Sequence, residues 1–553
     1  MELYHLKLKT QKVQSFIFKV PKLKAMLGAN SLLGEFFAKD LPKLREGFGK
    51  FNILEKGKIS ENDENEKKEL NKDFIWQNDD IVNHFENGIN CSAGGHFESI
   101  FKERGDAVNF LKEAITKAKE KIPGVTISYF LRKFNDTYSF KKYEDKYLDD
   151  KEDITEEISE VLPLIDCPYF YPSTEDGENP ALLYSKDNDS LMVKKIKEQG
   201  NKFYSLNTDD FLCKLLKMDM KLKKDEIPNS LEDIRDTSFI PGNNKMALIA
   251  IDGNGMGDRF NSKREELKNK NKNVLDTLIE IENFWFDARN NFRIALQNAF
   301  KKCCNLDSYI GEITDVNGKT KTTKLPFIVL MLGGDDLLLI TVPEIAFDFV
   351  KCFNNKLTEI ASNVTFSTGI AFVRYDYPFV HAHELAESLL SSAKYKSREN
   401  AQLSNAVDWH IHFSSMYNDI KKIRLRDYYH IYDNTIEILT KRPYSIDDLS
   451  TLYSKAEETY KLIQRDEGIG RNKIKTFETI LKQGKYSSKL YGKILFEKEE
   501  SIKDLYTYDE EEINGKKIYI NNALDIIELL DLFKRKDNAE KNSSKQEVTD
   551  ETY

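Results

Sequence analysis

Three aspartates occupy positions at a strand end and at a hairpin turn, where carboxylates can gather around a cation. Asp252 closes the apolar run ALIAID, and Asp335 and Asp336 follow the glycine pair Gly333 and Gly334. Carboxylate oxygens are the ligands that Mg²⁺ prefers, and magnesium sites usually leave room for substrate phosphates. If the strand that ends at Asp252 lies beside the hairpin, the three side chains converge on one or two ions. Such ions would polarise both an attacking hydroxyl and a leaving pyrophosphate.

A Gly-Gly-Asp-Asp sequence is also a common surface turn, because glycine and aspartate suit turn geometry for backbone reasons alone. Here the turn is flanked by the apolar runs PFIVLML and LLLITV, which predict a hairpin buried on both faces at the centre of a sheet. Adjacent carboxylates beside buried strands repel each other, and a bound cation removes that repulsion. The context therefore favours metal binding over a plain turn.

The strand and hairpin that carry these aspartates have a second copy nearer the N-terminus. The first copy runs from MELYHLKLKT through CSAGGHFESIF to VTISYF, and the second from MALIAIDGNG through MLGGDDLLLIT to VTFSTGIAFV. The interval from Gly95 to Val125 equals the interval from Gly334 to Val364, at 30 positions each. This agreement favours duplication of one unit, read as strand, helix, hairpin, helix and strand, which is typical of a palm domain.

The chain of 553 residues is long enough for three to four domains, and its pattern changes along its length. We predict an α+β fold with two palm domains of the ferredoxin-like, nucleotidyl-cyclase type. A small connector domain separates the palms, and a helical domain follows them. The predicted ranges are a first palm at 1–165, a connector at 166–240, a second palm at 241–415, a helical C-terminal domain at 416–535 and a disordered tail at 536–553.

Composition restricts the class of protein further. The chain carries 83 basic and 92 acidic residues, so its net charge of −9 argues against a general nucleic-acid coat and allows only regional contact. The six cysteines form no C-x-x-C pair, which indicates neither a zinc ribbon nor a disulfide framework and fits a reducing cytoplasm. The alternating N-terminus reads as a strand, and no apolar run approaches the ~20 residues that span a bilayer. We therefore expect a globular cytoplasmic protein without a membrane segment.

The chain resembles the large polymerase/cyclase subunit of type III CRISPR effector complexes, most closely that of the type III-B branch. The resemblance rests on QKVQSFIFKVPKLKAMLGANSLLGEFF near the start, on IDGNGMGDRF and LGGDD, and on GIAFVRYDYPFVHAHELAESLLSSAKYKSREN followed by DWHIHF. It implies that ATP is joined into oligoadenylates, typically cyclic, with Mg²⁺ or Mn²⁺ when the complex binds a foreign transcript. It also implies partners, namely the other subunits of the ribonucleoprotein, with guide RNA and target RNA contacted mainly through the complex.

The resemblance also implies roles for residues of the second palm. Asp252, Asp335 and Asp336 correspond to catalytic metal ligands. Lys394 falls where related palms place a phosphate-contacting lysine, although a lysine on an amphipathic helix is by default only solvated. The remaining nucleotide-binding residues expected in this palm are Gly253, Asn254, Gly333 and Gly334.

In the first palm, Gly94-Gly95-His96-Phe97 stands where the second has Gly-Gly-Asp-Asp, so this copy lacks the metal carboxylates. We expect it to be catalytically silent. With a predicted Gly28-Ala29-Asn30 turn, it would offer a second nucleotide pocket in which Gly94, Gly95 and Asn30 hold the acceptor. The alternative is that the first palm is only a scaffold.

Three departures from the family pattern qualify this interpretation. Asn254 stands where the family usually has the second aspartate of Asp-Gly-Asp, which would weaken one metal site. None of the eight histidines precedes an aspartate, so we expect neither the N-terminal His-Asp nuclease domain nor DNase activity. The cysteine spacing gives no support for the zinc insertion common in the family.

Two other functions fit the same sequence. One is adenylyl transfer to a different small acceptor, such as S-adenosylmethionine, in the altered first-palm pocket. The other is a non-catalytic assembly subunit, in which Asn254 marks decay of the metal chemistry.

Overall fold

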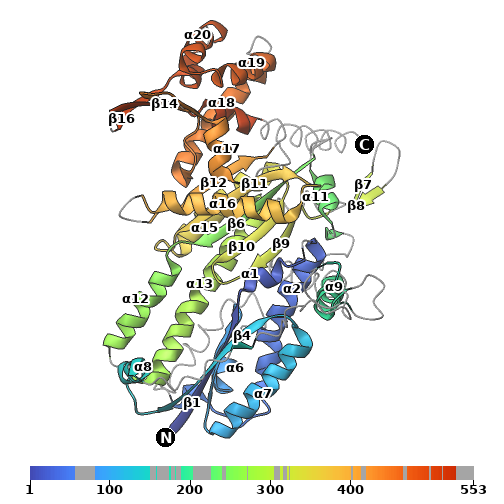
Figure 1. The fold of residues 1–553 in the computed structure, drawn as a ribbon, viewed down its shortest axis with the longest axis vertical. Coiled ribbons are helices and arrows are strands. Elements are labelled where there is room, and N and C mark those ends of the chain that lie inside the picture. The colour runs from blue at the N-terminus through green and yellow to red at the C-terminus, as the bar shows by residue number, and fades with distance from the viewer. Residues whose placement is uncertain are drawn as a thin grey trace, which may run out of the picture. The chain divides into compact units, whose positions relative to one another are not determined.

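The computed structural model groups the described residues into two compact units (Figure 1). The first comprises Met1–Ile227, Gly255–Gln297 and Leu330–Asp335, and the second comprises Pro228–Asn254, Asn298–Val329 and Asp336–Tyr553. The predicted domain boundaries stay predictions. The structure describes the chain except residues 21, 57–80, 150–156, 159–172, 176–180, 182–188, 203–225, 229, 239–243, 271, 304–311, 315–319, 323, 400–402, 413–418, 465–469, 497–499, 514 and 531–553.

The N-terminal sheet has the strand order β2-β3-β1-β4-β5, and its neighbouring strands are antiparallel. Helix α7 packs against β1 and β3. The strands are β1 (Glu2–Gln11), β2 (Ile89–Ala93), β3 (His96–Phe101), β4 (Thr126–Asn135) and β5 (Glu157–Ile158). The helices are α1 (Val13–Ile17), α2 (Leu23–Glu35), the π-helix η1 (Phe36–Asp40), α3 (Leu41–Arg45), α4 (Ile53–Lys56), α6 (Ile81–Glu86), α7 (Arg104–Lys121), α8 (Phe140–Asp149) and, in the predicted connector, α9 (Leu191–Lys202).

The second sheet has the order β15-β12-β11-β6-β10-β9. Strand β6 is buried along most of its length because its run of aliphatic residues is covered on both faces. The strands are β6 (Lys245–Gly253), β9 (Phe327–Leu332), β10 (Asp336–Thr341), β11 (Phe366–Arg374), β12 (Ala406–Ile411) and β15 (Tyr444–Ser445). The helices of this part are α11 (Leu231–Thr237), α12 (Met256–Asn269), α13 (Val274–Cys303), α15 (Pro343–Ile360) and α16 (Phe379–Ser397).

The two sheets share one topology, which confirms the predicted duplication. The order β2-β3-β1-β4 of the first sheet corresponds strand by strand to β9-β10-β6-β11 of the second. In each copy a helix follows the hairpin and leads to the next strand, α7 in the first and α15 in the second. Helix α15 begins at Pro343 as expected, because the fixed φ of proline suits the first helical turn. The predicted α+β fold with two palm-type units is therefore confirmed.

The position predicted for the second hairpin within its sheet is wrong. Strand β9 ends the sheet, whereas β6 and β11 are central. The first four side chains of β9 are still buried, and Phe300 of α13 stacks on Phe327 with ring centroids 3.7 Å apart. A continuous apolar run reports burial, but it does not say whether strands or helices provide that burial.

A long helix inserted in the second palm contributes to the core of the first unit. The N-terminal half of α13 places Val274, Leu278 and Phe286 among the buried side chains of the first palm, which include Leu3 and Ile100. The first palm is therefore completed by a segment that lies far away in sequence.

Other local predictions have mixed outcomes. Strands β7 (Glu312–Thr314) and β8 (Thr320–Thr322) pair antiparallel, and residues 315–319 between them lie outside the described residues. The predicted tail at 536–553 also lies outside them. Cys352 is disulfide-bonded, which cysteine spacing did not predict because tertiary structure brings such residues together. Across the described ranges, no helix is long and apolar enough to cross a membrane.

The C-terminal region is less purely helical than predicted. It contains helices, but also a four-stranded sheet in the order β13-β14-β17-β16. Its strands are short, and their mixed polar and aromatic residues resemble those of the neighbouring helices, so periodicity did not separate them. The helices are α17 (Ile420–Asp427), α18 (Ile446–Gln464), α19 (Arg471–Leu481), α20 (Lys485–Leu495) and the 3₁₀ helix η4 (Glu500–Tyr506), and the strands are β13 (Tyr429–Ile431), β14 (Thr435–Ile438), β16 (Asp509–Ile513) and β17 (Lys516–Ile520).

A buried polar network crosses the first sheet. His5 of β1 lies with Nδ1 2.7 Å from the Tyr143 hydroxyl and with Nε2 3.2 Å from Glu98 Oε2. Burial lowers the pKa of His5 from 6.5, and the charge of Lys7 lowers it further, while the hydrogen bond to Glu98 acts in the opposite direction. The folded state therefore holds His5 neutral.

The network predicts a loss of stability in mild acid. Because the His5 pKa is lower in the folded than in the unfolded chain, its contribution is present above pH 6.5 and is lost as the pH falls below it, by up to about 1.4 kcal/mol per pH unit. A His5→Gln variant keeps a donor and an acceptor but does not titrate. Between pH 7.5 and 5.5, the melting temperature should fall less in this variant than in the wild type. Because other buried histidines also titrate, the difference between the two slopes is the measurement. Equal slopes would contradict the assignment.

Candidate active site

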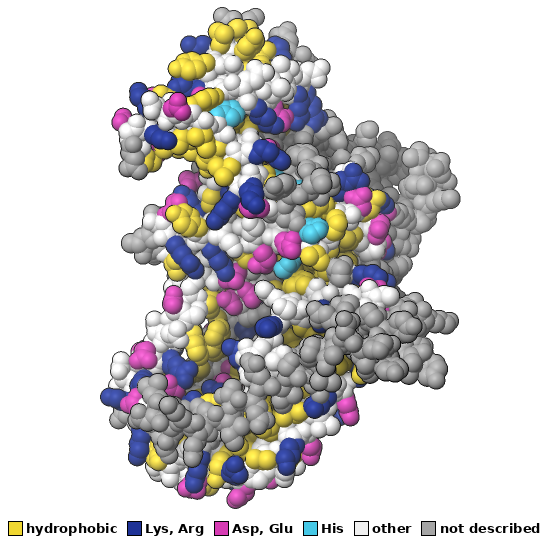
Figure 2. Space-filling model, viewed as in Figure 1, with side chains coloured by type: hydrophobic (Ala, Val, Ile, Leu, Met, Phe, Trp, Pro, Cys, Tyr) yellow, Lys and Arg dark blue, Asp and Glu magenta, His cyan; other side chains and the backbone are white. Residues whose placement is uncertain are grey.

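The three aspartates singled out in the sequence lie together. Asp252 near the end of β6 is the cross-strand partner of Asp336 at the start of β10, and Asp335 directly precedes Asp336. One ligand oxygen from each carboxylate lies within 4.8 Å of the others, and all three residues are half-buried. An all-oxygen donor set of this kind fits a hard divalent cation such as Mg²⁺ or Mn²⁺. Acidic side chains gather in the middle of the face seen in Figure 2.

Lys394 is placed where it offsets part of this negative charge. Its Nζ lies 2.6 Å from Asp252 Oδ2, with the two side chains 29% and 25% exposed. Helix α16 can bring the lysine there because it packs closely on β11: a Cβ at Gly369 would lie 2.3 Å from the Ala386 carbonyl oxygen. Glycine is therefore required at the contact that sets the position of this helix.

A fourth carboxylate, which was not predicted from the sequence, lies in this environment. Glu387 precedes Lys394 by two helical turns, so both lie on one face of α16. Burial raises the pKa of Glu387, the charge of Asp252 raises it further, and Lys394 acts in the opposite direction. The spacing of seven residues between Glu387 and the predicted lysine was the available signal.

Asn254 is engaged in hydrogen bonds within the protein. Its Oδ1 accepts from Ser367 Oγ at 2.7 Å, and its Nδ2 donates to Thr365 Oγ1 at 3.3 Å and to the Ser404 carbonyl at 3.2 Å. The side chain is 5% exposed, and its backbone N–H donates to the Thr365 carbonyl. The neighbouring Gly253 ends β6 and is also buried. Asn254 therefore fastens the end of β6 to β11 and to the segment before β12.

Glycine pairs occupy the turns of both hairpins, but for different physical reasons. Gly94 and Gly95 have φ values of 59° and 77° and form a two-residue turn between Ala93 and His96, a geometry that favours glycine at both positions. A Cβ at Gly95 would also lie 2.1 Å from Thr10 Oγ1. These glycines are thus explained by the turn, and their predicted role in acceptor binding stays a prediction.

The second glycine pair is not required by its backbone. Neither Gly333 nor Gly334 has a positive φ, and a Cβ at Gly334 would meet only Arg289 Cγ at an ordinary contact distance of 3.6 Å. The turn beside the acidic cluster therefore keeps its surface free of side chains without a local need for glycine.

The turn predicted at Gly28-Ala29-Asn30 is wrong, because these residues lie inside helix α2. Gly28 allows a close approach of α2 and α9, since a Cβ there would lie 2.0 Å from the Ile196 carbonyl oxygen. Asn30 Nδ2 donates to the Leu330 carbonyl of β9 at 3.1 Å. The structure thus places Asn30 against β9 of the second-palm hairpin, and its predicted role in acceptor binding stays a prediction.

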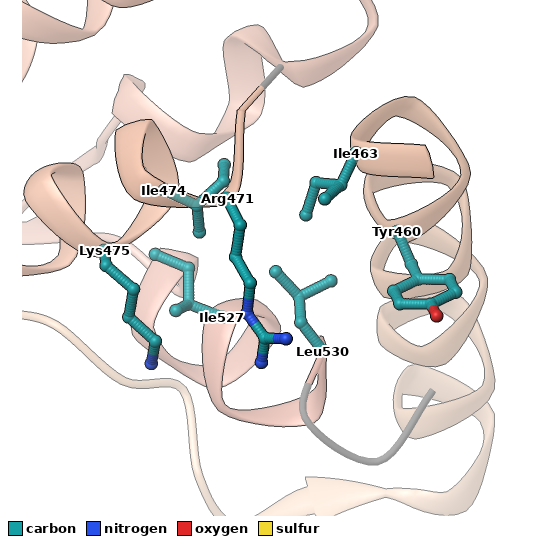
Figure 3. Close-up of a pocket in the computed structure, with 7 residues that line it drawn as sticks. All are labelled: Tyr460, Ile463, Arg471, Ile474, Lys475, Ile527 and Leu530. Atoms are coloured by element: carbon teal, nitrogen blue, oxygen red, sulfur yellow. The ribbon is translucent and has the colours of Figure 1, made fainter. Parts of the chain in front are cut away.

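A separate small pocket lies in the C-terminal region between α18, α19 and the helical residues 523–530 (Figure 3). The Arg471 side chain extends between the aliphatic walls of the pocket, while Lys475 points away. The pocket contains none of the predicted site residues. Its lining consists of Tyr460, Ile463, Arg471, Ile474, Lys475, Ile527 and Leu530.

The sheet order and the acidic cluster beside a hairpin define a palm-type domain. Residues 245–402 match the family described as Cas10/Cmr2, second palm domain. These residues are therefore similar to the second palm of Cas10/Cmr2, which agrees with the predicted resemblance to the large type III subunit, while the type III-B branch stays a prediction. No curated protein matches the chain.

Solved structures with similarity to the chain share little sequence with it. The Csm1-Csm4 cassette in complex with pppApApA is 11% identical with a TM-score of 0.39, covering 84% of this chain and 62% of that chain. The cassette in complex with cA4 is 12% identical with a TM-score of 0.41, covering 92% and 66%. Csm1 in T. onnurineus is 13% identical with a TM-score of 0.39, covering 89% and 65%. The chain thus spans less than two thirds of the length of the first of these chains.

The environment of Asn254 reverses the simple expectation that an aspartate there would improve metal binding. In Asn254→Asp the carboxylate cannot donate to the Ser404 carbonyl, so we expect the free energy of unfolding to fall by about 1–3 kcal/mol. The concentration of Mg²⁺ that half-saturates the site should not decrease. Urea unfolding and a magnesium titration of the same variant measure the two effects. A stable variant that needs less magnesium would show that residue 254 can reach the ion.

The contrast between the glycine pairs gives a matched pair of variants. Gly95→Ala should lower the free energy of unfolding by more than about 1 kcal/mol, because alanine disfavours positive φ and meets Thr10. Gly334→Ala should be nearly neutral for stability but should weaken binding of a non-hydrolysable ATP analogue. Thermal unfolding and calorimetric titration separate the two effects. If Gly334→Ala binds the nucleotide as well as the wild type, Gly334 is not part of the nucleotide-binding site.

Proposed function

We propose that the chain is the polymerase-type subunit of a type III CRISPR effector complex and joins ATP into cyclic or linear oligoadenylates. The observation that carries the proposal is the cluster of Asp252, Asp335 and Asp336 in a domain that matches the Cas10/Cmr2 second palm. The ion pair of Lys394 with Asp252 supports it, because it puts a phosphate-binding cation at the same place.

The reaction is transfer of an adenylyl group to a hydroxyl. The acceptor 3′-oxygen bonds to the α-phosphorus of ATP, the bond from that phosphorus to the bridging oxygen breaks, pyrophosphate leaves, and the hydroxyl proton passes to solvent. A divalent cation bound by the three aspartates would neutralise phosphate charge and polarise the reacting oxygens. Lys394 exchanges its contact with Asp252 for the phosphates of ATP. The bare backbone at Gly333 and Gly334 allows the nucleotide to approach closely.

The partners follow from the same proposal. The chain assembles with the other subunits of the ribonucleoprotein and meets guide RNA and target RNA mainly through them. Its net charge of −9 agrees with this arrangement, because a subunit that coated RNA along its own surface would be basic.

The test uses the full chain, alone and assembled with the other effector subunits and a target RNA. Labelled ATP and Mg²⁺ are added, and the products are identified by mass. We expect oligoadenylates whose masses differ by one AMP unit. An adenylylated S-adenosylmethionine would support transfer to another acceptor, and the absence of any product would support a purely structural subunit.

The carboxylates of the turn should be essential for this product. Asp335→Asn with Asp336→Asn should reduce product at least 100-fold without loss of folding, because metal binding needs charged oxygens. The matched control is Asp447→Asn with Asp448→Asn, an adjacent and exposed aspartate pair at the start of α18. Full product formation by a folded Asp335/Asp336 variant would overturn the proposal.

A further inference from the structure

Helix α13 carries a buried ion pair close to the acidic turn. Arg289 Nη2 donates to Glu282 Oε1 at 2.7 Å, and the two side chains are only 8% and 6% exposed. The residues are seven apart, so they occupy one face of the helix. An ion pair withdrawn from water to this extent is costly unless further contacts hold its geometry.

At one end the pair touches the turn that carries the aspartates. The position of a Cβ on Gly334 lies 3.6 Å from Arg289 Cγ, so the alkyl part of the arginine packs behind this residue. Gly334 immediately precedes Asp335. A shift of Arg289 therefore changes the surface against which the backbone of Asp335 is held.

At the other end the pair reaches the first-palm hairpin. Glu282 lies beside the thiol of Cys91 on β2, three residues before Gly94. Burial raises the pKa of Cys91 and that of Glu282, and Arg289 acts against the rise at Glu282. One helix thus contacts the equivalent hairpins of the two palms through two charged side chains that contact each other.

We propose that Arg289 is a positioning residue that holds the acidic turn, and that Glu282 fixes Arg289 in place from the first-palm hairpin. The proposal rests on the proposed function only in treating this turn as the metal site. It gives the catalytically silent palm a task, which is to anchor the helix that supports the turn of the other palm.

The test variant must remove the pair without leaving a buried charge. Arg289→Met alone would leave Glu282 unpaired and destabilise the fold. The double variant Arg289→Met with Glu282→Gln removes one charge of each sign, so the net charge near the aspartates is unchanged. The control is Arg264→Met with Glu144→Gln, which removes a two-bond ion pair of α12 and α8 in the same unit.

The full chain is titrated with Mn²⁺ alone, and hydrogen exchange is followed in a peptide covering residues 329–337. We expect the double variant to bind Mn²⁺ about 10–100-fold more weakly, the usual effect of losing a group that orients metal ligands. Its exchange at the turn should be several-fold faster. The control should change neither quantity. The single variant Arg289→Lys keeps the charge but loses the planar fork. It should bind Mn²⁺ more weakly than the wild type and more tightly than the double variant.

Two results would overturn the proposal. If a folded double variant has unchanged Mn²⁺ affinity and unchanged hydrogen exchange, the ion pair has only a structural role in the core. Tighter Mn²⁺ binding by Arg289→Lys or by the double variant would mean that Arg289 acts by repelling the cation. If the double variant does not fold, Arg289→Lys decides by the same two measurements. Because neither measurement needs turnover, failure of the wild type to make oligoadenylate refutes the proposed function and leaves this test intact.

Discussion

Mutual repulsion among Asp252, Asp335 and Asp336 is the constraint on which the second palm depends. Their oxygens approach within 4.8 Å in a half-buried setting, where charges are screened less than in water. The fold reduces the repulsion by bringing Lys394 from α16 to Asp252, and this contact needs the close packing allowed at Gly369. In the proposed reaction a substrate phosphate would compete with Asp252 for Lys394, and a cation would compete with Lys394 for Asp252. The ion pair of Lys394 with Asp252 would then be replaced when metal and nucleotide bind together.

The two palm units share one topology, but the same residue type can be present for a different physical reason in each. Both hairpins contain a glycine pair, yet only Gly94 and Gly95 adopt the positive φ that makes glycine necessary. Neither Gly333 nor Gly334 has a positive φ, and at Gly334 the surroundings would accept a side chain, so glycine there leaves space beside the carboxylates. The same dipeptide is a folding requirement in one palm and a feature of the site surface in the other. The sequence repeat alone does not reveal this difference.

Motif spacing was sufficient to predict the duplicated palm, the convergence of the three aspartates and the position of Lys394. These features depend on local order along the chain and on a common sheet topology. The edge position of β9 was not predictable, because its first four side chains are buried although no strand flanks it on one side among the described residues. Asn30 was read as part of a turn because glycine and asparagine favour turns, whereas Gly28 serves the close contact of two helices. Contacts between distant segments, such as Glu282 with Cys91, leave no periodic signal in the sequence.

Asn254 makes structural hydrogen bonds at a position where the resemblance leads us to expect an aspartate. The three carboxylates beside it are kept. An aspartate would bring a further negative charge to a cluster that already contains three carboxylates and lies near Glu387. The amide avoids that charge, and it can donate to the Ser404 carbonyl and accept from Ser367 at the same time, which a carboxylate cannot do. The position therefore secures the strand end that presents Asp252. Because Asn254 makes these bonds, the cation of the proposed function would be held by Asp252, Asp335 and Asp336, which strands β6 and β10 bring together.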